Sequence, residues 1–386
     1  MIIGDSRKEL LALSPPGDAY YDSSQAVEAR VVTPSQNSKP TGSKVVVYGR
    51  DLNNSDLLLL GADRSLRKIM ADEYGISEKF SWVYPEAFST TSRKVIIYTG
   101  DGGKYFVKEK PRYCCTPYSL TLAAQFQEYL SSRTDFVPKI AHIRSGAPYL
   151  KVGEAIFFTT EFKNGRIFNA SMQDIERAGV ALGIIHNLSG EFSFEGARHI
   201  RAGDDSSEFI NLAERLKGAE NDEWRPVTIL ALKGLVEKYK DKLDGNVQYI
   251  VNHGDYAPFN LVYGEDGQVV AINDFDNVNF RPRTRDIAGA LLSFCDGLSY
   301  AGATSSLRKP ITTTVNLEKA KSFIECYLST AYALSDQEKS DLVGEICVRW
   351  AKIMALGIVR GDFNYKDVLD AMSFADFVEE NIPALV

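Results

Sequence analysis

The segment from residue 251 to residue 286 constrains the fold of this chain more than any other stretch of the sequence. Two short apolar runs, at residues 261–263 and 268–272, flank a Gly-Glu-Asp-Gly sequence at residues 264–267. Apolar runs separated by such turn residues are typical of a β-hairpin. A hairpin brings the residues before its first strand close to the residues after its second strand. The sequence therefore predicts that polar side chains far apart along the chain meet at the open end of this hairpin.

The residues on either side of the hairpin are rich in oxygen ligands. His253, Asp255 and Asn260 precede the first strand, and Asp274 and Asp276 follow the second. Carboxylate and amide oxygens are the ligands that Mg²⁺ prefers and that phosphate chemistry needs. A His-x-Asp-x-x-x-x-Asn sequence followed by Asp-Phe-x is the arrangement of phosphotransferases. The segment is therefore predicted to be a catalytic centre for phosphoryl transfer.

The wording of these motifs, HGDYAPFN and INDFDN, resembles the aminoglycoside phosphotransferase family more than the protein kinases. That family has HGD where most protein kinases have HRD, and an acidic residue after Asp-Phe where they have Gly. The resemblance extends from about residue 63 onward. It implies an α+β, two-lobed protein-kinase-like fold. The N-terminal lobe would hold an antiparallel sheet with one or two helices, and the C-terminal lobe would be mostly helical.

The order of predicted elements agrees with two lobes, and a chain of 386 residues is too long for one ordinary core. Strand-like runs dominate before residue 163 and helical patterns dominate after it. We expect residues 1–62 to form an extension packed on the small lobe, residues 63–163 to form the nucleotide-binding lobe, and residues 164–386 to form the catalytic and acceptor-binding lobe. In the small lobe we expect a helix from residue 63, a three-stranded meander at residues 80–83, 95–98 and 105–107, and a helix at about residues 119–130.

A lysine that follows the third strand is the candidate phosphate ligand. Lys108 comes directly after the apolar run at residues 105–107, and a lysine at this place would contact the α and β phosphates of ATP. Lys110 has the same facing, and an ordinary exposed lysine is the alternative. Glu128, in the next helix, is the candidate ion-pair partner of Lys108. A solvated helix residue is the alternative for Glu128.

The loop at residues 85–92 lies where kinases cover the phosphates, and it contains no glycine. Its hydroxyl side chains, with nearby backbone N–H groups, can still donate hydrogen bonds to phosphate. We therefore include Ser89, Thr90 and Thr91 in the nucleotide site.

A strand-like run at residues 156–160 leads into the sequence Glu161-Phe162-Lys163. The resemblance implies that these three residues form the hinge between the lobes, where backbone groups bind the adenine edge. A plain strand followed by a turn is the alternative.

In the expected reaction Asp255 accepts the proton of the acceptor hydroxyl. Asn260 and Asp274 would bind Mg²⁺, and Asp276 would assist them. His253 would shape the catalytic loop without transferring a proton.

Two further residues are expected to be structural. The family counterpart of Asp286 supports the catalytic loop by hydrogen bonding. His186 lies on a predicted helix with an apolar face, where a histidine is more often a packed, hydrogen-bonded residue than a ligand.

Composition limits the classes of partner and the cellular compartment that we expect for this protein. The formal net charge of −7 gives no basic surplus to neutralise nucleic acid phosphates. The five cysteines have no metal-ligand spacing, which favours reduced thiols in a cytoplasmic protein. The N-terminus does not resemble a secretory signal, and no apolar run approaches the length of a membrane span. We expect a monomer or homodimer.

The distance between two aspartates separates small-molecule kinases from protein kinases. Only eleven residues lie between Asp274 and Asp286, and no APE-like anchor follows, so there is no room for a long activation segment. We therefore predict an ATP-dependent phosphotransferase that phosphorylates a hydroxyl of a small molecule, either an antibiotic such as an aminoglycoside or a metabolite. Antibiotic resistance is one role that this implies. The alternatives are a protein-directed kinase and a catalytically silent nucleotide-binding protein. The glycine-free loop is the only sequence support for the silent protein, and the intact set of Asp255, Asn260, Asp274 and Lys108 opposes it.

The charged residues near the expected acceptor site do not identify the acceptor molecule. Within the expected acceptor-binding insert at residues 191–223, the stretch at residues 195–209 carries both signs of charge, without the dense acidity that a polycationic aminoglycoside would favour. Arg281, Arg283 and Arg285 can pair with acidic residues, contact an anionic acceptor or form a solvated surface.

Overall fold

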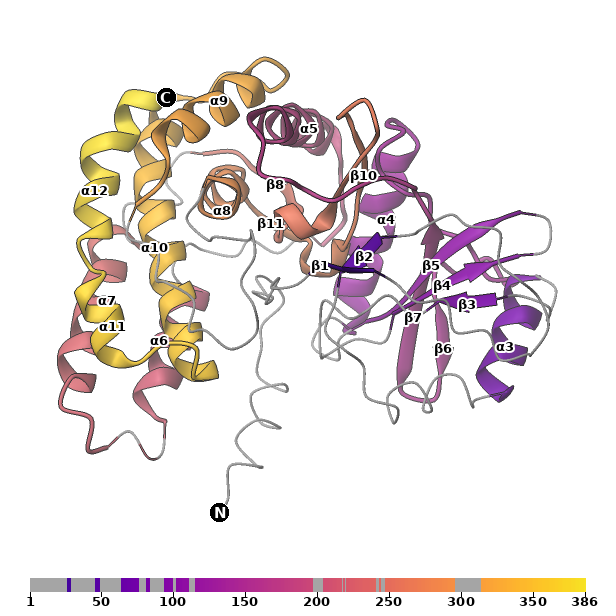
Figure 1. Cartoon of the computed structure of the whole chain (residues 1–386), viewed down its shortest axis with the longest axis horizontal. Coiled ribbons are helices and arrows are strands. Elements are labelled where there is room, and N and C mark those ends of the chain that lie inside the picture. The colour runs from indigo at the N-terminus through magenta and orange to yellow at the C-terminus, as the bar shows by residue number, and fades with distance from the viewer. Residues whose placement is uncertain are drawn as a thin grey trace. The chain divides into compact units, whose positions relative to one another are not determined.

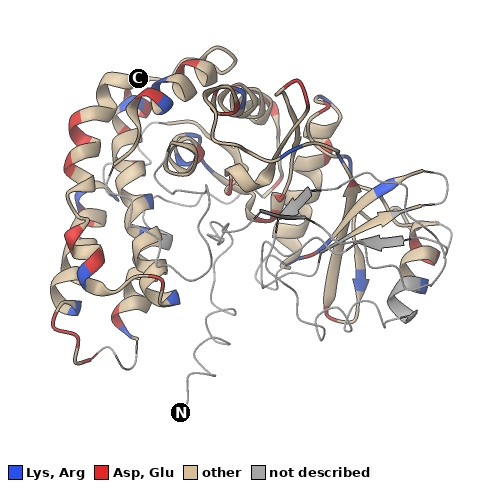
Figure 2. Cartoon of the chain, viewed as in Figure 1, with Lys and Arg blue, Asp and Glu red and all other residues tan. Residues whose placement is uncertain are grey.

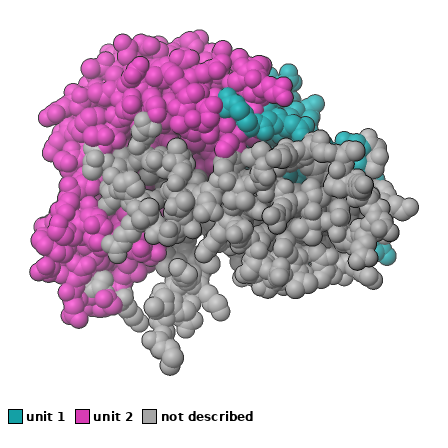
Figure 3. Space-filling view, viewed as in Figure 1, with its two compact units in different colours: residues 1–166, 270–276, 302–305 teal, residues 167–269, 277–301, 306–386 magenta. Residues whose placement is uncertain are grey.

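The computed structural model describes residues 26–28, 46–48, 64–75, 81–83, 94–99, 102–110, 115–196, 204–216, 218, 220–240, 243, 247–295 and 314–386. The chain divides into two compact units, which Figure 3 shows in different colours. Unit 1 contains residues 1–166, 270–276 and 302–305, and unit 2 contains residues 167–269, 277–301 and 306–386. Most of the predicted N-terminal extension lies outside the described residues, apart from two short paired strands, β1 (Ala26–Glu28) and β2 (Val46–Tyr48).

Unit 1 is built on a five-stranded antiparallel sheet (Figure 1). Its strand order is β3 (Ser81–Val83), β4 (Lys94–Tyr98), β5 (Lys104–Glu109), β7 (Ala155–Glu161) and β6 (Leu150–Val152). The first three strands follow one another along the chain and pair as neighbours. The predicted meander is thus confirmed, and β7 joins it on the far side of β5.

Both faces of this sheet bury apolar side chains, because neighbouring residues on a strand point to opposite faces. Phe157 packs in one cluster with Met70 of α3 (Arg64–Tyr74). Phe158, the next residue of β7, packs in another cluster with Leu120 of α4 (Pro117–Ser131). Full burial of one such side chain contributes about 1.5–3 kcal/mol. The helices α3 and α4 therefore hold the strand that pairs with the lysine-bearing β5.

Unit 2 is mostly helical, which confirms the predicted α+β class. Its helices are α5 (Met172–Glu191), α6 (Asp204–Glu214), α7 (Arg225–Lys240), α8 (Thr284–Phe294), α9 (Leu317–Leu328), α10 (Asp336–Arg360), α11 (Tyr365–Asp370) and α12 (Phe374–Asn381). Helix α10 begins with a capping box, in which Ser335 and Glu338 form reciprocal hydrogen bonds. The chain turns at residues 371–373 between α11 and α12.

Two pairs of strands lead into and out of the catalytic segment. The predicted hairpin is confirmed: β9 (Leu261–Tyr263) and β10 (Val269–Ile272) form a two-stranded sheet, and the Gly264 N–H donates to the Gln268 carbonyl at 2.8 Å across the turn. The sequence did not predict the second pair, β8 (Tyr249–Asn252) with β11 (Asn279–Pro282). Strand β8 ends directly before His253, and β11 ends shortly before α8.

The helices α5 and α9 approach each other closely, because two glycines of α5 face the backbone of α9. A Cβ atom on Gly179 or Gly183 would collide with the carbonyl oxygen of Phe323 or Tyr327, respectively. This close packing brings the side chains of α9 within reach of the last turns of α5. Among the described residues, no helix has both the length and the apolar character that crossing a membrane requires.

Candidate active site

In unit 1 the predicted phosphate lysine meets the predicted metal carboxylates. The Lys108 ammonium lies 2.5 Å from Asp274 Oδ1 and 2.6 Å from Asp276 Oδ2. The three side chains are only 8%, 10% and 3% exposed, respectively. Buried charges persist where they are paired. Lys108 is therefore not the ordinary exposed lysine that the sequence left open.

The segment that carries the two aspartates is anchored in unit 1. The Ile272 N–H donates to the Phe136 carbonyl at 2.8 Å, and the buried Phe275 ring contacts Phe126 of α4 edge-to-face at 6.2 Å. Between them Asp274 has a φ of 69°, in the left-handed region that non-glycine residues seldom adopt. Such a conformation costs on the order of 1–3 kcal/mol and occurs often at functional sites. The anchors on both sides hold the Asp274 backbone in this conformation.

The Asp274–Asp276 pair fits a divalent cation by its chemistry. Among the described residues, no group of three or more His, Cys, Asp or Glu side chains is arranged to hold a metal ion. However, Mg²⁺ in phosphotransferases takes only one or two carboxylates together with water and substrate phosphates. The two aspartates already converge on one cation, the Lys108 ammonium, so they can also converge on a metal ion.

The other candidate residues of unit 1 lie apart from this cluster or outside the described residues. Glu128, the predicted partner of Lys108, is 38% exposed and lies 2.5 Å from His142 Nε2, so its role toward Lys108 stays a prediction. Ser89, Thr90 and Thr91 lie outside the described residues.

The predicted hinge residues lie at the end of β7, whose last residue is Glu161. The Glu161 N–H donates to the Lys139 carbonyl at 2.9 Å, and the Phe162 N–H donates to the Lys104 carbonyl at 3.1 Å. Lys163 Nζ pairs with Glu161 Oε1 at 3.0 Å. The adenine-binding role of these three residues stays a prediction, and the two engaged N–H groups mean that other backbone groups would have to serve it.

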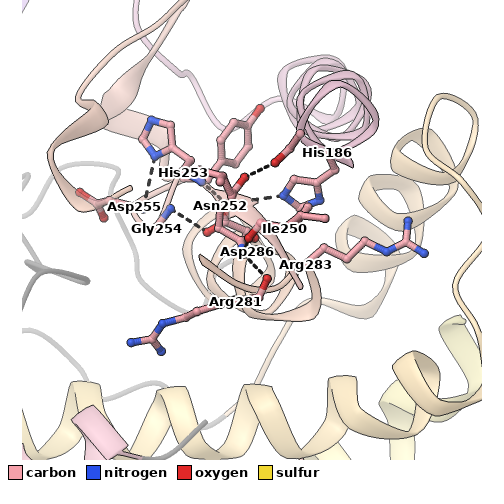
Figure 4. A network of polar contacts seen from close by, with 12 residues as sticks. His186, Ile250, Asn252, His253, Gly254, Asp255, Arg281, Arg283 and Asp286 are labelled. Atoms are coloured by element: carbon pink, nitrogen blue, oxygen red, sulfur yellow. Dashed lines mark hydrogen bonds and ion pairs between the residues drawn. The ribbon is translucent and has the colours of Figure 1, made fainter. Parts of the chain in front are cut away.

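In unit 2 the loop between β8 and β9 brings Asp255 and Asn260 together. Asn260 Nδ2 donates to the Asp255 carbonyl oxygen at 2.8 Å and to the Asp255 carboxylate at 3.2 Å. The Asp255 N–H points to His253 Nδ1 at 3.3 Å. All three side chains are buried, with His253 fully so. In Figure 4 the Asp255 carboxylate points away from the polar contacts that hold its loop.

The loop is fixed from below by Asp286, in the first turn of α8. Its carboxylate accepts the backbone N–H of His253 at 2.8 Å and that of Gly254 at 3.0 Å (Figure 4). Burial alone would raise the pKa of Asp286, but the contact with His186 and the positive charge of Arg349 outweigh it and lower this pKa. Asp286 is therefore a charged acceptor that orders the loop, in the supporting position that the sequence predicted.

His186 is a packed, hydrogen-bonded residue, as the sequence predicted. Its Nδ1 lies 3.0 Å from the Tyr327 hydroxyl and its Nε2 lies 3.6 Å from Asp286. Burial lowers the pKa of His186, despite the nearby Asp286 carboxylate, so the imidazole is neutral. A neutral ring with its proton on Nε2 lets the Tyr327 hydroxyl donate to Nδ1 and leaves the Nε2–H facing the Asp286 carboxylate.

The conformation of Gly254 explains why the motif has glycine between His253 and Asp255. Its φ is +81°, and a Cβ atom at this place would overlap the Asn277 carbonyl oxygen and lie 2.5 Å from Asn279 Nδ2. Asn277 lies just before β11, and Asn279 is the first residue of that strand. The close approach of these two residues to the loop therefore requires glycine, and the arginine of an HRD motif would not fit.

Two of the three arginines left open by the sequence pair with acidic residues. Arg283 binds both carboxylate oxygens of Glu338, at 2.6 and 2.9 Å, and donates to the backbone carbonyl of Tyr332 at 2.8 Å. Arg285 lies 3.2 Å from Glu345, and both side chains are 2% exposed. Neither guanidinium forms a solvated surface.

Comparisons with known proteins agree with this geometry. A family model described as "Phosphotransferase enzyme family" (APH) matches residues 88–307. A comparison with curated proteins gives no match.

Solved structures of small-molecule kinases share the fold. An amicoumacin kinase in complex with AMP-PNP, Ca²⁺ and Ami matches with a TM-score of 0.62 and 14% identity, over 85% of this chain and 96% of that one. A microcompartment-associated aminopropanol kinase matches with a TM-score of 0.57 and 13% identity, over 81% and 94%. A spectinomycin phosphotransferase in complex with ADP and spectinomycin matches with a TM-score of 0.54 and 15% identity, over 83% and 96%. The predicted two-lobed protein-kinase-like fold is confirmed.

Proposed function

This chain belongs to the phosphotransferase enzyme family (APH), and from that premise we propose that it transfers the γ-phosphate of ATP to a hydroxyl group of a small molecule. The observation that carries the proposal is the convergence of Lys108 on Asp274 and Asp276. A lysine on the small-lobe sheet and an acidic pair after the hairpin are the charged groups with which phosphotransferases handle ATP. A catalytically silent nucleotide-binding protein would not need to retain Asp255 and Asn260 in addition to Lys108 and the acidic pair.

Asp255 acts as the base in this proposal. The acceptor oxygen forms a bond to the γ-phosphorus, the bond from that phosphorus to the β–γ bridging oxygen breaks, and ADP leaves. The hydroxyl proton passes to the Asp255 carboxylate. Asn260 holds this carboxylate through its 3.2 Å hydrogen bond, and Asp286 fixes the loop through two backbone N–H groups. A base that is ordered before the substrate arrives needs little rearrangement during the reaction.

Charge neutralisation is the second contribution. Lys108 steadies the α and β phosphates, and Asp274, Asp276 and Asn260 would hold Mg²⁺. The bound ion would neutralise charge on the β- and γ-phosphate oxygens. We expect Asp274 to be the principal carboxylate ligand and Asp276 to assist it.

The acceptor in this proposal is a hydroxylated antibiotic, such as an aminoglycoside, or a hydroxylated metabolite. The similar structures include kinases named for amicoumacin, aminopropanol and spectinomycin, which are all small molecules. Lys and Arg are interspersed with Asp and Glu along the described helices (Figure 2), so the described charge favours no single acceptor sign. A cytoplasmic location, where ATP is available, completes the proposal.

The test is a screen of hydroxylated amines, antibiotics and metabolites with ATP and Mg²⁺, read by mass spectrometry as the gain of a phosphoryl group. The variant Asp255→Asn should lower kcat by roughly 10²- to 10⁴-fold, the usual contribution of a general base, and should leave ATP affinity nearly unchanged. The control Glu265→Gln changes an exposed carboxylate in the turn of the same hairpin and should keep full activity. Turnover that survives in Asp255→Asn removes Asp255 as the base. Phosphate that appears only on generic protein substrates favours a protein-directed kinase.

A further inference from the structure

A second lysine shares the acidic pair of unit 1 with Lys108. Lys110 follows β5 directly, and its N–H donates to the Ile156 carbonyl at 2.8 Å, so its backbone stays paired with β7. Residues two apart on a strand point to the same face. The Lys110 side chain accordingly lies on the Lys108 face, is 5% exposed, and forms an ion pair with Asp276 Oδ1.

Burial of this second ammonium group needs an explanation. Lysine is almost never fully buried unless it is paired, because its charge loses hydration. The Lys110 Nζ lies 4.4 Å from the centre of the Phe158 ring, a cation–π distance that supplies only part of the compensation. The carboxylate of Asp276 supplies the rest, although Lys108 already occupies its other oxygen. Because Lys108 also pairs with Asp274, Lys110 is the second positive charge that balances the two carboxylates.

The arrangement shows what the two lysines can do together. Lys108 lies on Oδ2 of Asp276 and Lys110 on Oδ1, so the two ammonium groups converge on the two oxygens of one anionic group. Two aspartates and two lysines give this cluster a formal charge of zero. When the nucleotide and its cation bind, the carboxylates gain a new positive partner and the ammonium groups become available to phosphate oxygens.

We propose that Lys110 is a second nucleotide-binding lysine, which shares the polyphosphate of ATP with Lys108 in the bound state. The inference rests on the proposed function, since it assigns a residue to the nucleotide site of that reaction. The general kinase arrangement uses one lysine on this strand. The second lysine would supply additional positive charge for the phosphates in a chain whose predicted phosphate loop contains no glycine.

The test measures nucleotide binding and not turnover. The variant Lys110→Met removes the charge and keeps a long apolar side chain against Phe158. Calorimetric titration of the variant with ATP, in the presence of Mg²⁺, should show an affinity lowered by roughly 10- to 100-fold. This is the usual loss when a hydrogen bond to a charged group is removed. The affinity for adenosine should be nearly unchanged. The control is Lys104→Met. Lys104 is the first residue of β5, and its Nζ donates to Asn164 Oδ1 at 3.1 Å. The ATP affinity of this variant should lie within about 2-fold of that of the unaltered protein.

Each outcome separates the inference from the proposed function. An unchanged ATP affinity in Lys110→Met, or an equal loss for ATP and adenosine, overturns the role of Lys110 while the unaltered protein still binds ATP and phosphorylates its acceptor. Failure of the unaltered protein to bind ATP overturns the proposed function instead. Where Lys110→Met does not fold, as judged by circular dichroism, Lys110→Arg decides. If Lys110→Arg keeps the ATP affinity and Lys110→Gln loses it, the result supports phosphate binding by the positive charge at this position. Unchanged affinity in Lys110→Gln refutes it.

Discussion

Substitution of Gly254 by alanine tests the catalytic loop most directly. The φ of +81° is unfavourable for any side chain, and the added Cβ would overlap the Asn277 carbonyl oxygen and crowd Asn279 Nδ2. Neither neighbour moves freely, because Asn279 begins β11 and Nδ2 of that residue donates to the Asn277 carbonyl at 2.7 Å. The strain must therefore shift either the loop or the segment that faces it.

The magnitude follows from two separate contributions. An alanine in the left-handed region costs about 1–2 kcal/mol, and forced overpacking costs about 1–3 kcal/mol. Gly361, which follows α10, is the matched control: its φ is +78°, and a Cβ atom there meets nothing within 4 Å. Gly361→Ala should therefore show only the first contribution. The difference between the two variants, about 1–3 kcal/mol, corresponds to roughly 2–12 °C in the unfolding temperature of a unit of this size.

The assay combines thermal unfolding, followed by tryptophan fluorescence, with steady-state kinetics on the acceptor found by screening. Gly254→Ala should unfold at the lower temperature and also lose kcat, since a displacement of about 1 Å in the loop can cost on the order of 10²-fold in rate. Gly361→Ala should keep kcat. Equal unfolding temperatures for the two variants, with kcat retained in Gly254→Ala, would refute the argument that the Asn277 contact requires glycine.

Two buried titratable groups give further predictions. Burial lowers the pKa of His186 in the folded protein. At a pH between that lowered pKa and about 6.5, the unfolded chain therefore binds more protons than the folded protein. The free energy of unfolding should accordingly fall by up to about 1.4 kcal/mol per pH unit as the pH drops below about 6.5. Urea unfolding should show a flatter pH dependence in His186→Gln but not in His142→Gln, whose histidine is 45% exposed, and equal slopes would contradict the assignment. Burial raises the pKa of the Cys347 thiol to about 12, so peptide mapping after treatment with a thiol reagent near pH 8 should find Cys347 unmodified until the protein unfolds, whereas the partly exposed Cys115 should be modified in the folded protein.

The features that the sequence predicted depend on local chemistry. The hairpin follows from turn residues between two apolar runs. The position of Lys108 after an apolar strand predicted its inward direction. These signals lie within a few residues of the structure that they specify, so no knowledge of distant contacts is needed.

The features that the sequence did not predict depend on distant contacts. The strand β11 contains Asn279 and Pro282 and lacks a clear apolar alternation, so only its pairing with β8 identifies it. Tyr327 reaches His186 from 141 residues away, and no spacing rule connects them. Lys110 had the same facing as Lys108, but only the ion pair with Asp276 shows that both lysines are buried.

The eleven residues between Asp274 and Asp286 support the proposed choice of a small acceptor. They form a 3₁₀ turn, the strand β11 and the start of α8, and the ring of Phe275 is 2% exposed. Arg283, near the end of the segment, is held by both carboxylate oxygens of Glu338. A regulatory activation segment must exchange between ordered and disordered states, and these pairings and buried contacts would all have to break for that exchange. The proposed phosphotransferase would therefore be constitutively ordered between its two aspartates.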